Sequence, residues 1–216
     1  MATGKMDPIK LIVVGPAGVN HRNSQNPWII FKFRIYFQSG KTTVANFLAD
    51  ASEIPFEYRP TQGVRILEFD VSNVNTKTNQ SKVDIELWDC SGDRRFESCW
   101  SAFRRDTQGV IFVYSKLTPD LVWELEKLYD YFVSQTKLEP KNCVVFYFAG
   151  DKSHLDPPKR ISPTFAKISQ VNCNIEDDGN KLKSDFQTFL GTLMTMIQER
   201  KEQEESIILR GNTTFR

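Results

Sequence analysis

Two halves of one glycine-rich motif, separated by twenty residues, constrain this chain more than any other feature. The first half, Gly15 to Gly18, follows an apolar run, and the second half, Ser39 to Thr42, opens an amphipathic segment. Without the residues between them, Val19 to Gln38, the halves would join as G-P-A-G-S-G-K-T and fit the pattern G-x-x-x-x-G-K-[ST]. Between a strand and a helix, that pattern is typical of loops whose backbone amides bind phosphates. The sequence therefore predicts a phosphate-binding loop that is interrupted.

The twenty intervening residues change character along their length. They begin polar and end in Trp28 to Phe37, an apolar and aromatic stretch with strong strand propensity. The segment preserves the reading frame, and Val19 and Gln38 can be encoded with the GT and AG that bound an intron. This favours a retained intron, and a genuine loop stays open as the alternative. For the chain as written we expect poor nucleotide binding and aggregation, because Gly18 and Ser39 are no longer neighbours and an apolar strand is added.

The rest of the chain alternates between apolar runs of strand type and amphipathic segments of helix type. Strands are predicted at residues 11–14, 64–71, 83–88, 109–114, 143–149 and 165–171. Helices are predicted at residues 42–49, 96–105, 119–136 and 182–200. A polar turn at residues 72–81 joins the second and third strands into a hairpin. This alternation favours an α/β fold with a mostly parallel six-stranded sheet and helices on both faces, which binds ligands at the carboxyl ends of its strands.

Length and composition indicate one globular domain. With 216 residues, of which 40% are apolar and 25% charged, the chain is large enough to bury a substantial core. We expect a single domain at residues 7–200, interrupted by residues 19–38, and a charged, frayed tail at residues 201–216. Lys and Arg total 28 against 27 Asp and Glu, so the chain has no overall basic field that would attract nucleic acid.

Signals for secretion and lipid attachment are not found in the terminal segments of this sequence. Residues 1–10 lack a long apolar stretch, the chain starts Met-Ala rather than Met-Gly, and no cysteine lies near the last residue. We therefore expect a cytoplasmic protein without a direct lipid anchor. The four cysteines, at positions 90, 99, 143 and 173, are widely spaced, and we predict reduced thiols in or near the core.

Five residues in or after the second half of the motif have side chains or amides suited to phosphate and metal. Lys41 would reach the β- and γ-phosphates, and Thr42 would bind magnesium. Asp89, at the end of a strand, would supply a carboxylate on the metal side, and Thr61 would add a second hydroxyl. The amide of Gly92 can approach a γ-phosphate because glycine has no side chain in the way. Together they predict a magnesium nucleotide site.

Two segments resemble the switch motifs of Rab-type small GTPases. Residues 58–64, YRPTQGV, are similar to the first switch, and residues 88–93, WDCSGD, are similar to the second. The runs ANFL at 45–48, PTQGVRILEF at 60–69 and FESCW at 96–100 narrow the resemblance to the Rab-like protein 5 family. The resemblance implies the small-GTPase form of the P-loop NTPase fold, with GTP or GDP and Mg²⁺ as cofactors.

The same resemblance implies a cellular role. Members of that family are subunits of the intraflagellar transport B complex, which implies a role in cilium assembly and transport as an assembly and interaction module. The expected partners are coiled-coil subunits of that complex, with no nucleic acid among them. The expected location is the cytoplasm and the cilium or flagellum with its base. The alternative function is an active switch enzyme that hydrolyses GTP to GDP in vesicle or ciliary trafficking.

The resemblance also assigns site residues, position by position. Nucleotide contacts are implied for Gly15, Gly18, Ser39, Gly40, Lys41, Thr42, Thr43, Thr61, Asp89, Gly92, Asp151 and Lys152. Metal contacts are implied for Thr42, Thr61 and Asp89. We assign no catalytic residue, because Asp93 stands where active relatives have a water-orienting glutamine. A carboxylate there donates no hydrogen bond to the γ-phosphate and repels it, so we expect slow or no intrinsic hydrolysis.

The guanine-reading motif departs from the family pattern as well. Where the family has N-K-x-D, this chain has Asp151, Lys152 and His154. The lysine is retained, but the aspartate that would accept hydrogen bonds from guanine N1 and N2 is replaced, which leaves the choice of base open. A nucleotide-free scaffold therefore stays among the hypotheses, whereas the short chain and the switch motifs argue against a P-loop kinase or ATPase.

Three tryptophans lie near these motifs. Trp88 and Trp100 flank the second switch, and we interpret them as core residues, with a partner-binding anchor as the alternative. Trp123 lies in the predicted helix at 119–136, where we expect it to pack that helix onto the sheet.

Overall fold

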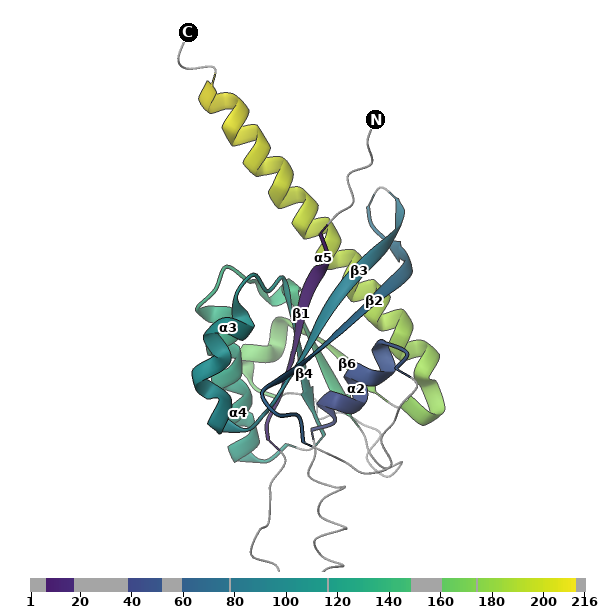
Figure 1. Ribbon diagram of the computed structural model, residues 1–216, viewed down its shortest axis with the longest axis vertical. Coiled ribbons are helices and arrows are strands. Elements are labelled where there is room, and N and C mark those ends of the chain that lie inside the picture. Colours follow the sequence, from purple (N-terminus) through teal and green to yellow (C-terminus); the bar gives the residue numbers. More distant parts are fainter. Residues whose placement is uncertain are drawn as a thin grey trace, which may run out of the picture.

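One six-stranded sheet forms the centre of the molecule (Figure 1). The computed structural model describes residues 7–17, 39–51, 60–77, 79–115, 117–148, 161–173 and 175–212. The strand order is β2-β3-β1-β4-β5-β6, and every neighbouring pair except β2 and β3 is parallel. The predicted six-stranded, mostly parallel sheet is confirmed.

The bounds of the elements follow the labels of Figure 1. The strands are β1 Ile9–Val14, β2 Val64–Asn75, β3 Gln80–Cys90, β4 Gly109–Tyr114, β5 Cys143–Phe148 and β6 Ser169–Cys173. The α-helices are α2 Lys41–Leu48, α3 Trp100–Arg104, α4 Pro119–Tyr129 and α5 Ile175–Asn212. Short 3₁₀ helices occupy Arg94–Cys99, Pro140–Asn142 and Pro163–Lys167, and a π-helical turn at Asp130–Ser134 extends α4.

Helices cover both faces of the sheet, as predicted, because the central strands are apolar on both sides. On one face, Leu11 and Val13 of β1 belong to a core cluster that also includes apolar residues of α2 and α5. On the other face, Ile12 and Val14 belong to a cluster with apolar residues of α3 and α4. Alternate residues of one strand therefore face different helix layers. The carboxyl ends of the parallel strands emerge together at one edge of the sheet.

Several predicted boundaries were wrong. The hairpin turn predicted at 72–81 is much shorter, since β2 continues to Asn75 and β3 starts at Gln80. Backbone pairing extends through these polar residues because ladder hydrogen bonds do not require apolar side chains. The strand predicted at 165–171 is instead a 3₁₀ helix that starts at Pro163, followed by β6.

The C-terminal helix α5 is 38 residues long and extends further in both directions than the predicted helix at 182–200. It continues to Asn212, although the sequence predicted a frayed tail from residue 201. Residues 199–205 are mostly Glu, Lys, Arg and Gln, which have high helix propensity. Figure 1 shows the end of α5 projecting beyond the sheet. Neither α5 nor any other helix in the described part of the chain is apolar enough, over a sufficient length, to cross a membrane.

The cysteines match the prediction at three positions of four. Cys90, Cys143 and Cys173 are free thiols buried in the core. Cys99 was expected in or near the core but is exposed, because it ends the 3₁₀ helix on the outer side of the second switch.

Candidate phosphate and metal site

The two halves of the glycine-rich motif meet in space. Lys41, at the start of α2, donates hydrogen bonds from Nζ to the backbone oxygens of Gly15 at 3.1 Å and Pro16 at 3.0 Å. Its third donor bonds the Ser39 hydroxyl at 2.9 Å. The lysine therefore joins the end of the first half to the second half, although the sequence separates them by residues 19–38. Gly18, also predicted for this site, lies outside the described residues.

Two glycines of the site stand where a side chain would not fit. Gly40 has a left-handed φ of 82°, and a Cβ there would lie 2.6 Å from the ring of Phe148. A Cβ at Gly92 would lie 2.8 Å from the amide nitrogen of Ala17 and 2.9 Å from the backbone oxygen of Gly15. The second switch glycine therefore packs directly against the first half of the phosphate loop.

Three oxygen-bearing side chains converge at the end of β3. Thr42 donates to Oδ2 of Asp89 at 2.8 Å, and Thr61 donates to the same atom at 3.2 Å. The two hydroxyl oxygens are 3.0 Å apart. Asp89 is fully buried, and its other oxygen, Oδ1, has no hydrogen-bond partner among the described residues. The arrangement brings together the three metal ligands that the sequence predicted.

This set of side chains fits a magnesium ion. Mg²⁺ prefers oxygen ligands and is held in nucleotide sites by one or two protein oxygens together with phosphates and water. One buried carboxylate and two hydroxyls meet that requirement, and the unpartnered Oδ1 leaves acceptor capacity. The described part of the chain contains no cluster of three or more His, Cys, Asp or Glu side chains that would suit a different metal centre.

Burial perturbs both charged groups of the site. Desolvation lowers the pKa of Lys41 to about 8, and the nearby Asp89 carboxylate opposes that shift. Desolvation raises the pKa of Asp89, while the Thr42 hydrogen bond, Lys41 and Arg65 oppose the increase. The charges of Lys41 and Asp89 thus each counteract the effect of burial on the other group. A bound phosphate would add negative charge beside Lys41 and favour its ammonium form further.

The lowered pKa of Lys41 predicts a pH dependence of stability. In the unfolded chain this lysine binds its proton up to about pH 10.5, but in the folded chain only up to about 8. Between these values the unfolded state binds more protons, so the free energy of unfolding rises with pH by at most about 1.4 kcal/mol per pH unit from this group. We expect the wild-type chain to gain stability relative to Lys41→Met between pH 8 and 10, measured by urea unfolding. A constant difference would contradict the burial of the ammonium group.

The other predicted site residues are placed less centrally. Thr43 is exposed on α2. Asp93, at the water-orienting position, accepts from the Arg95 amide at 3.0 Å and pairs with the Arg95 guanidinium at 2.7 Å, so it caps the 3₁₀ helix that follows. Asp151, Lys152 and the rest of the base-reading loop lie outside the described residues.

Two residues near the metal ligands were not predicted. Arg65 of β2 lies opposite Asp89 of β3 and places Nη2 3.7 Å from Oδ2. Its guanidinium also donates to the side-chain oxygen of the buried Asn46 on α2. The alternation of β2 could have indicated which side chains share a face, but the hairpin register that pairs Arg65 with Asp89 cannot be read from periodicity alone.

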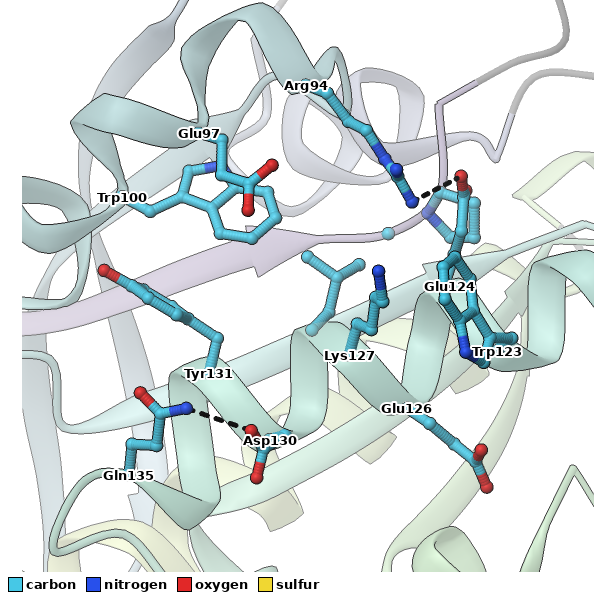
Figure 2. Close-up of a pocket in the computed structure, with 14 residues that line it drawn as sticks. Arg94, Glu97, Trp100, Trp123, Glu124, Glu126, Lys127, Asp130, Tyr131 and Gln135 are labelled. Carbon is cyan, nitrogen blue, oxygen red and sulfur yellow. Dashed lines mark hydrogen bonds and ion pairs between the residues drawn. The ribbon is translucent and has the colours of Figure 1, made fainter.

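A cavity of about 420 Å³ lies beside the phosphate loop, between the second switch and α4 (Figure 2). Gly15, Pro16 and Gly92 form part of its wall. Trp123, predicted to pack α4 onto the sheet, is instead 51% exposed at its rim. Lys127 Nζ lies 3.5 Å from the Trp123 ring centre, and the adjacent Glu124 carboxylate is 3.7 Å from Arg94.

The prediction for Trp123 failed for a geometric reason. Leu125 and Leu128 of α4 are buried against the sheet. Trp123 precedes Leu125 by two residues, which places it on the opposite side of the helix. Of the other two tryptophans, Trp100 is buried and Trp88 is half-buried with its ring 6.3 Å from that of Phe103, as expected for core residues.

Comparisons with known proteins agree with this arrangement. The family model described as "Ras of Complex, Roc, domain of DAPkinase" matches residues 37–153, which is more than half of the chain. The intraflagellar transport protein 22 homolog of Rattus norvegicus is 38% identical over 177 residues, which cover 80% of this chain and 93% of the relative. The homolog of Danio rerio is 37% identical over 186 residues, which cover 83% of this chain and all of the relative.

Solved structures show the same fold. A GTP-bound crystal structure of T. brucei IFT22/74/81 aligns with a TM-score of 0.66 and 19% identity, covering 90% of this chain and 99% of that chain. A GDP-bound crystal structure of T. brucei IFT22 aligns with a TM-score of 0.58 and 19% identity, covering 88% and 97% of the two chains. At this identity the structures support the fold, and the sequence relatives carry the family assignment.

Proposed function

The chain belongs to the intraflagellar transport protein 22 family of Rab-like small GTPases, and from this we propose that it is a GTP- and GDP-binding subunit of the intraflagellar transport B complex. In this role it acts in cilium assembly and transport as an assembly module. Its nucleotide, with Mg²⁺, stabilises the surface that partner subunits recognise. Its place is the cytoplasm and the cilium or flagellum with its base.

One observation carries the nucleotide part of the proposal. Residues from four separate segments, the two motif halves and the two switches, meet around Lys41 and Asp89. If these residues served only to form turns, there would be no reason for two hydroxyl groups to bond one buried carboxylate. Solved T. brucei relatives are described as GTP-bound and GDP-bound, which supports the same ligand class for this chain.

Each residue has a defined task in this proposal. The ammonium group of Lys41 would exchange its backbone acceptors for phosphate oxygens, and the amides at the start of α2 would face the phosphates. Thr42, Thr61 and Asp89 would hold Mg²⁺, whose positive charge would offset the charge of the β- and γ-phosphates. The close packing of Gly92 on the phosphate loop lets the second switch sense the γ-phosphate.

Slow hydrolysis is the second part of the proposal. Asp93 is engaged as the cap of a 3₁₀ helix and pairs with Arg95. A carboxylate in this position offers no donor to a γ-phosphate, so the attacking water would lack the orienting group that active relatives supply. The bound nucleotide would then persist and keep the assembly surface in one state.

The partner proposal is a coiled-coil pair of subunits of the intraflagellar transport B complex. A T. brucei relative has been crystallised in a structure described as IFT22/74/81, which supports this class of partner. Nucleic acid forms no part of the proposal, consistent with 28 basic and 27 acidic residues.

Calorimetric titration with GTP, GDP, XTP and ATP tests the nucleotide part. With the chain lacking residues 19–38, we expect binding of GTP or GDP at micromolar or lower concentration and loss of that binding in Lys41→Ala. XTP serves as the probe for altered base choice, since Asp151 and His154 depart from the guanine-reading pattern. Absence of binding of all four nucleotides would refute the proposal in favour of a nucleotide-free scaffold.

An active GTP-hydrolysing switch is the alternative, and one contact favours it. Thr61 of the first switch contacts both Thr42 and Asp89. Loss of a γ-phosphate or metal at these residues would therefore change the conformation of that switch. Single-turnover hydrolysis separates the two functions. Fast turnover that depends on Thr61 would establish the enzyme, and slow turnover with tight binding supports the assembly module.

A further inference from the structure

The metal carboxylate has a positively charged neighbour on the adjacent strand. Arg65 and Asp89 stand directly opposite each other in the antiparallel pair of β2 and β3. The guanidinium Nη2 lies 3.7 Å from Oδ2, the same oxygen that accepts from both threonines. Asp89 is fully buried, whereas the Arg65 side chain is 39% exposed. The partly exposed guanidinium therefore places a permanent positive charge beside a buried carboxylate.

Helix α2 fixes the position of this arginine. The Arg65 guanidinium donates to the side-chain oxygen of Asn46, which is buried. Asn46 follows Thr42 by four residues, so both side chains lie on the same side of α2. One residue of the helix thus contacts Asp89 and the other contacts its cationic neighbour. The Nε group of Arg65 is also buried and has no hydrogen-bond partner among the described residues. The guanidinium is therefore held in place by Asn46 and Asp89 alone among its described polar contacts.

The charge of Arg65 acts in opposite directions on the metal-free and metal-bound chain. Without a metal, a buried carboxylate needs positive charge nearby, and an arginine at this distance supplies part of it. With a divalent cation on Thr42 and Asp89, the same guanidinium lies close to a second positive charge and repels it. The arginine therefore stabilises the site when it is empty and weakens its hold on the ion.

We propose that Arg65 is the resident counter-ion of Asp89 and lowers the affinity of this site for Mg²⁺. The inference rests on the proposed nucleotide and metal site. It adds a residue that tunes the affinity of that site for the metal. Arg65 is not a ligand of the ion in this proposal, and it acts by the charge that it places beside Asp89. Asn46 keeps it in place.

The test compares Arg65→Gln, which removes the charge, with Arg65→Lys, which keeps it. The EDTA measurement uses the full chain, and the Mg²⁺ and GDP series uses the chain lacking residues 19–38, which is the form expected to bind nucleotide. Arg200→Gln, an exposed change on α5, controls for the loss of one charge from the protein. Thermal midpoints are measured in EDTA and across a Mg²⁺ series with excess GDP, and Mn²⁺ binding is followed by electron paramagnetic resonance. In EDTA, we expect Arg65→Gln to unfold at a lower temperature than Arg65→Lys. With GDP present, it should reach half-saturation at roughly tenfold lower Mg²⁺.

Two outcomes would overturn the inference. Equal midpoints of the two Arg65 variants in EDTA would show that Asp89 does not depend on this charge. Equal Mg²⁺ and Mn²⁺ affinities would show that the guanidinium does not oppose the ion. If the chain lacking residues 19–38 does not respond to Mg²⁺ and GDP at any concentration, that result would contradict the proposed function instead, and the EDTA comparison would still decide the role of Arg65.

Discussion

Removal of residues 19–38 is expected to raise the affinity of the chain for GTP and GDP by about 100-fold or more. The deletion makes Gly18 and Ser39 covalent neighbours and completes the run of amides that binds the α- and β-phosphates. Two recovered hydrogen bonds to a charged group contribute about 3 kcal/mol or more, which corresponds to at least about a 100-fold change in dissociation constant. Calorimetric titration of both chains with each nucleotide measures the change.

A matched control separates the covalent join from the loss of an apolar segment. Replacement of residues 19–38 by twenty Gly and Ser residues removes the aromatic stretch but keeps the interruption. We expect this variant to aggregate less than the chain as written and to bind nucleotide just as poorly. Tight binding by the full chain would contradict the prediction, and would mean that the contacts of Lys41 with Gly15 and Pro16 are enough to assemble the loop.

Gly191→Ala is expected to destabilise the fold by about 3 kcal/mol, the upper end of the range for overpacking. Gly191 lies in α5 where the helix crosses the β2–β3 hairpin, and a Cβ there would stand 2.1 Å from the backbone oxygen of Asn75. A backbone atom held in a strand cannot move aside as a side chain can, so α5 would have to shift away from β2. Urea unfolding monitored by circular dichroism measures the loss.

Gly179→Ala in the same helix provides the control. A Cβ at Gly179 would lie 2.7 Å from the outer edge of the Phe47 ring, which can rotate. Alanine also favours the helix over glycine by about 1 kcal/mol. We expect a net change within about 1 kcal/mol at this position. A similar loss for both variants would indicate that α5 tolerates no added volume anywhere, and a neutral Gly191→Ala would refute the close packing of α5 on the hairpin.

The sequence predicted the sheet, and it singled out several residues that the fold brings close together, for identifiable reasons. Continuous apolar runs indicated β1, β4 and β5, because strands buried on both faces carry no polar alternation. The order of Thr42, Thr61 and Asp89 along the chain predicted residues that the fold brings together within hydrogen-bond distance, while Lys41 bonds both halves of the motif. These predictions depend on local pattern and on the rule that parallel strands end at one edge.

Local sequence patterns did not predict the direction of individual side chains or the register of the strands. Trp123 was misplaced because a tryptophan was taken as a core residue, although its position on α4 is opposite the buried leucines. Asp93 was predicted only as a replacement for glutamine, and its pairing with Arg95 and its role as a helix cap emerged from the fold. The long ladder between β2 and β3 was underestimated because polar strand residues give no apolar signal.

The phosphate loop shows which features the sequence determines and which depend on the tertiary structure. By itself, the sequence determined which residues are suited to phosphate and metal, since the hydrogen-bond donors and acceptors of lysine, threonine and aspartate are set by residue type. Only the tertiary structure decided that the separated halves meet at Lys41 and that Arg65 stands beside Asp89. The reason is physical: proximity between distant segments depends on strand order and register, which the whole hydrophobic core selects together.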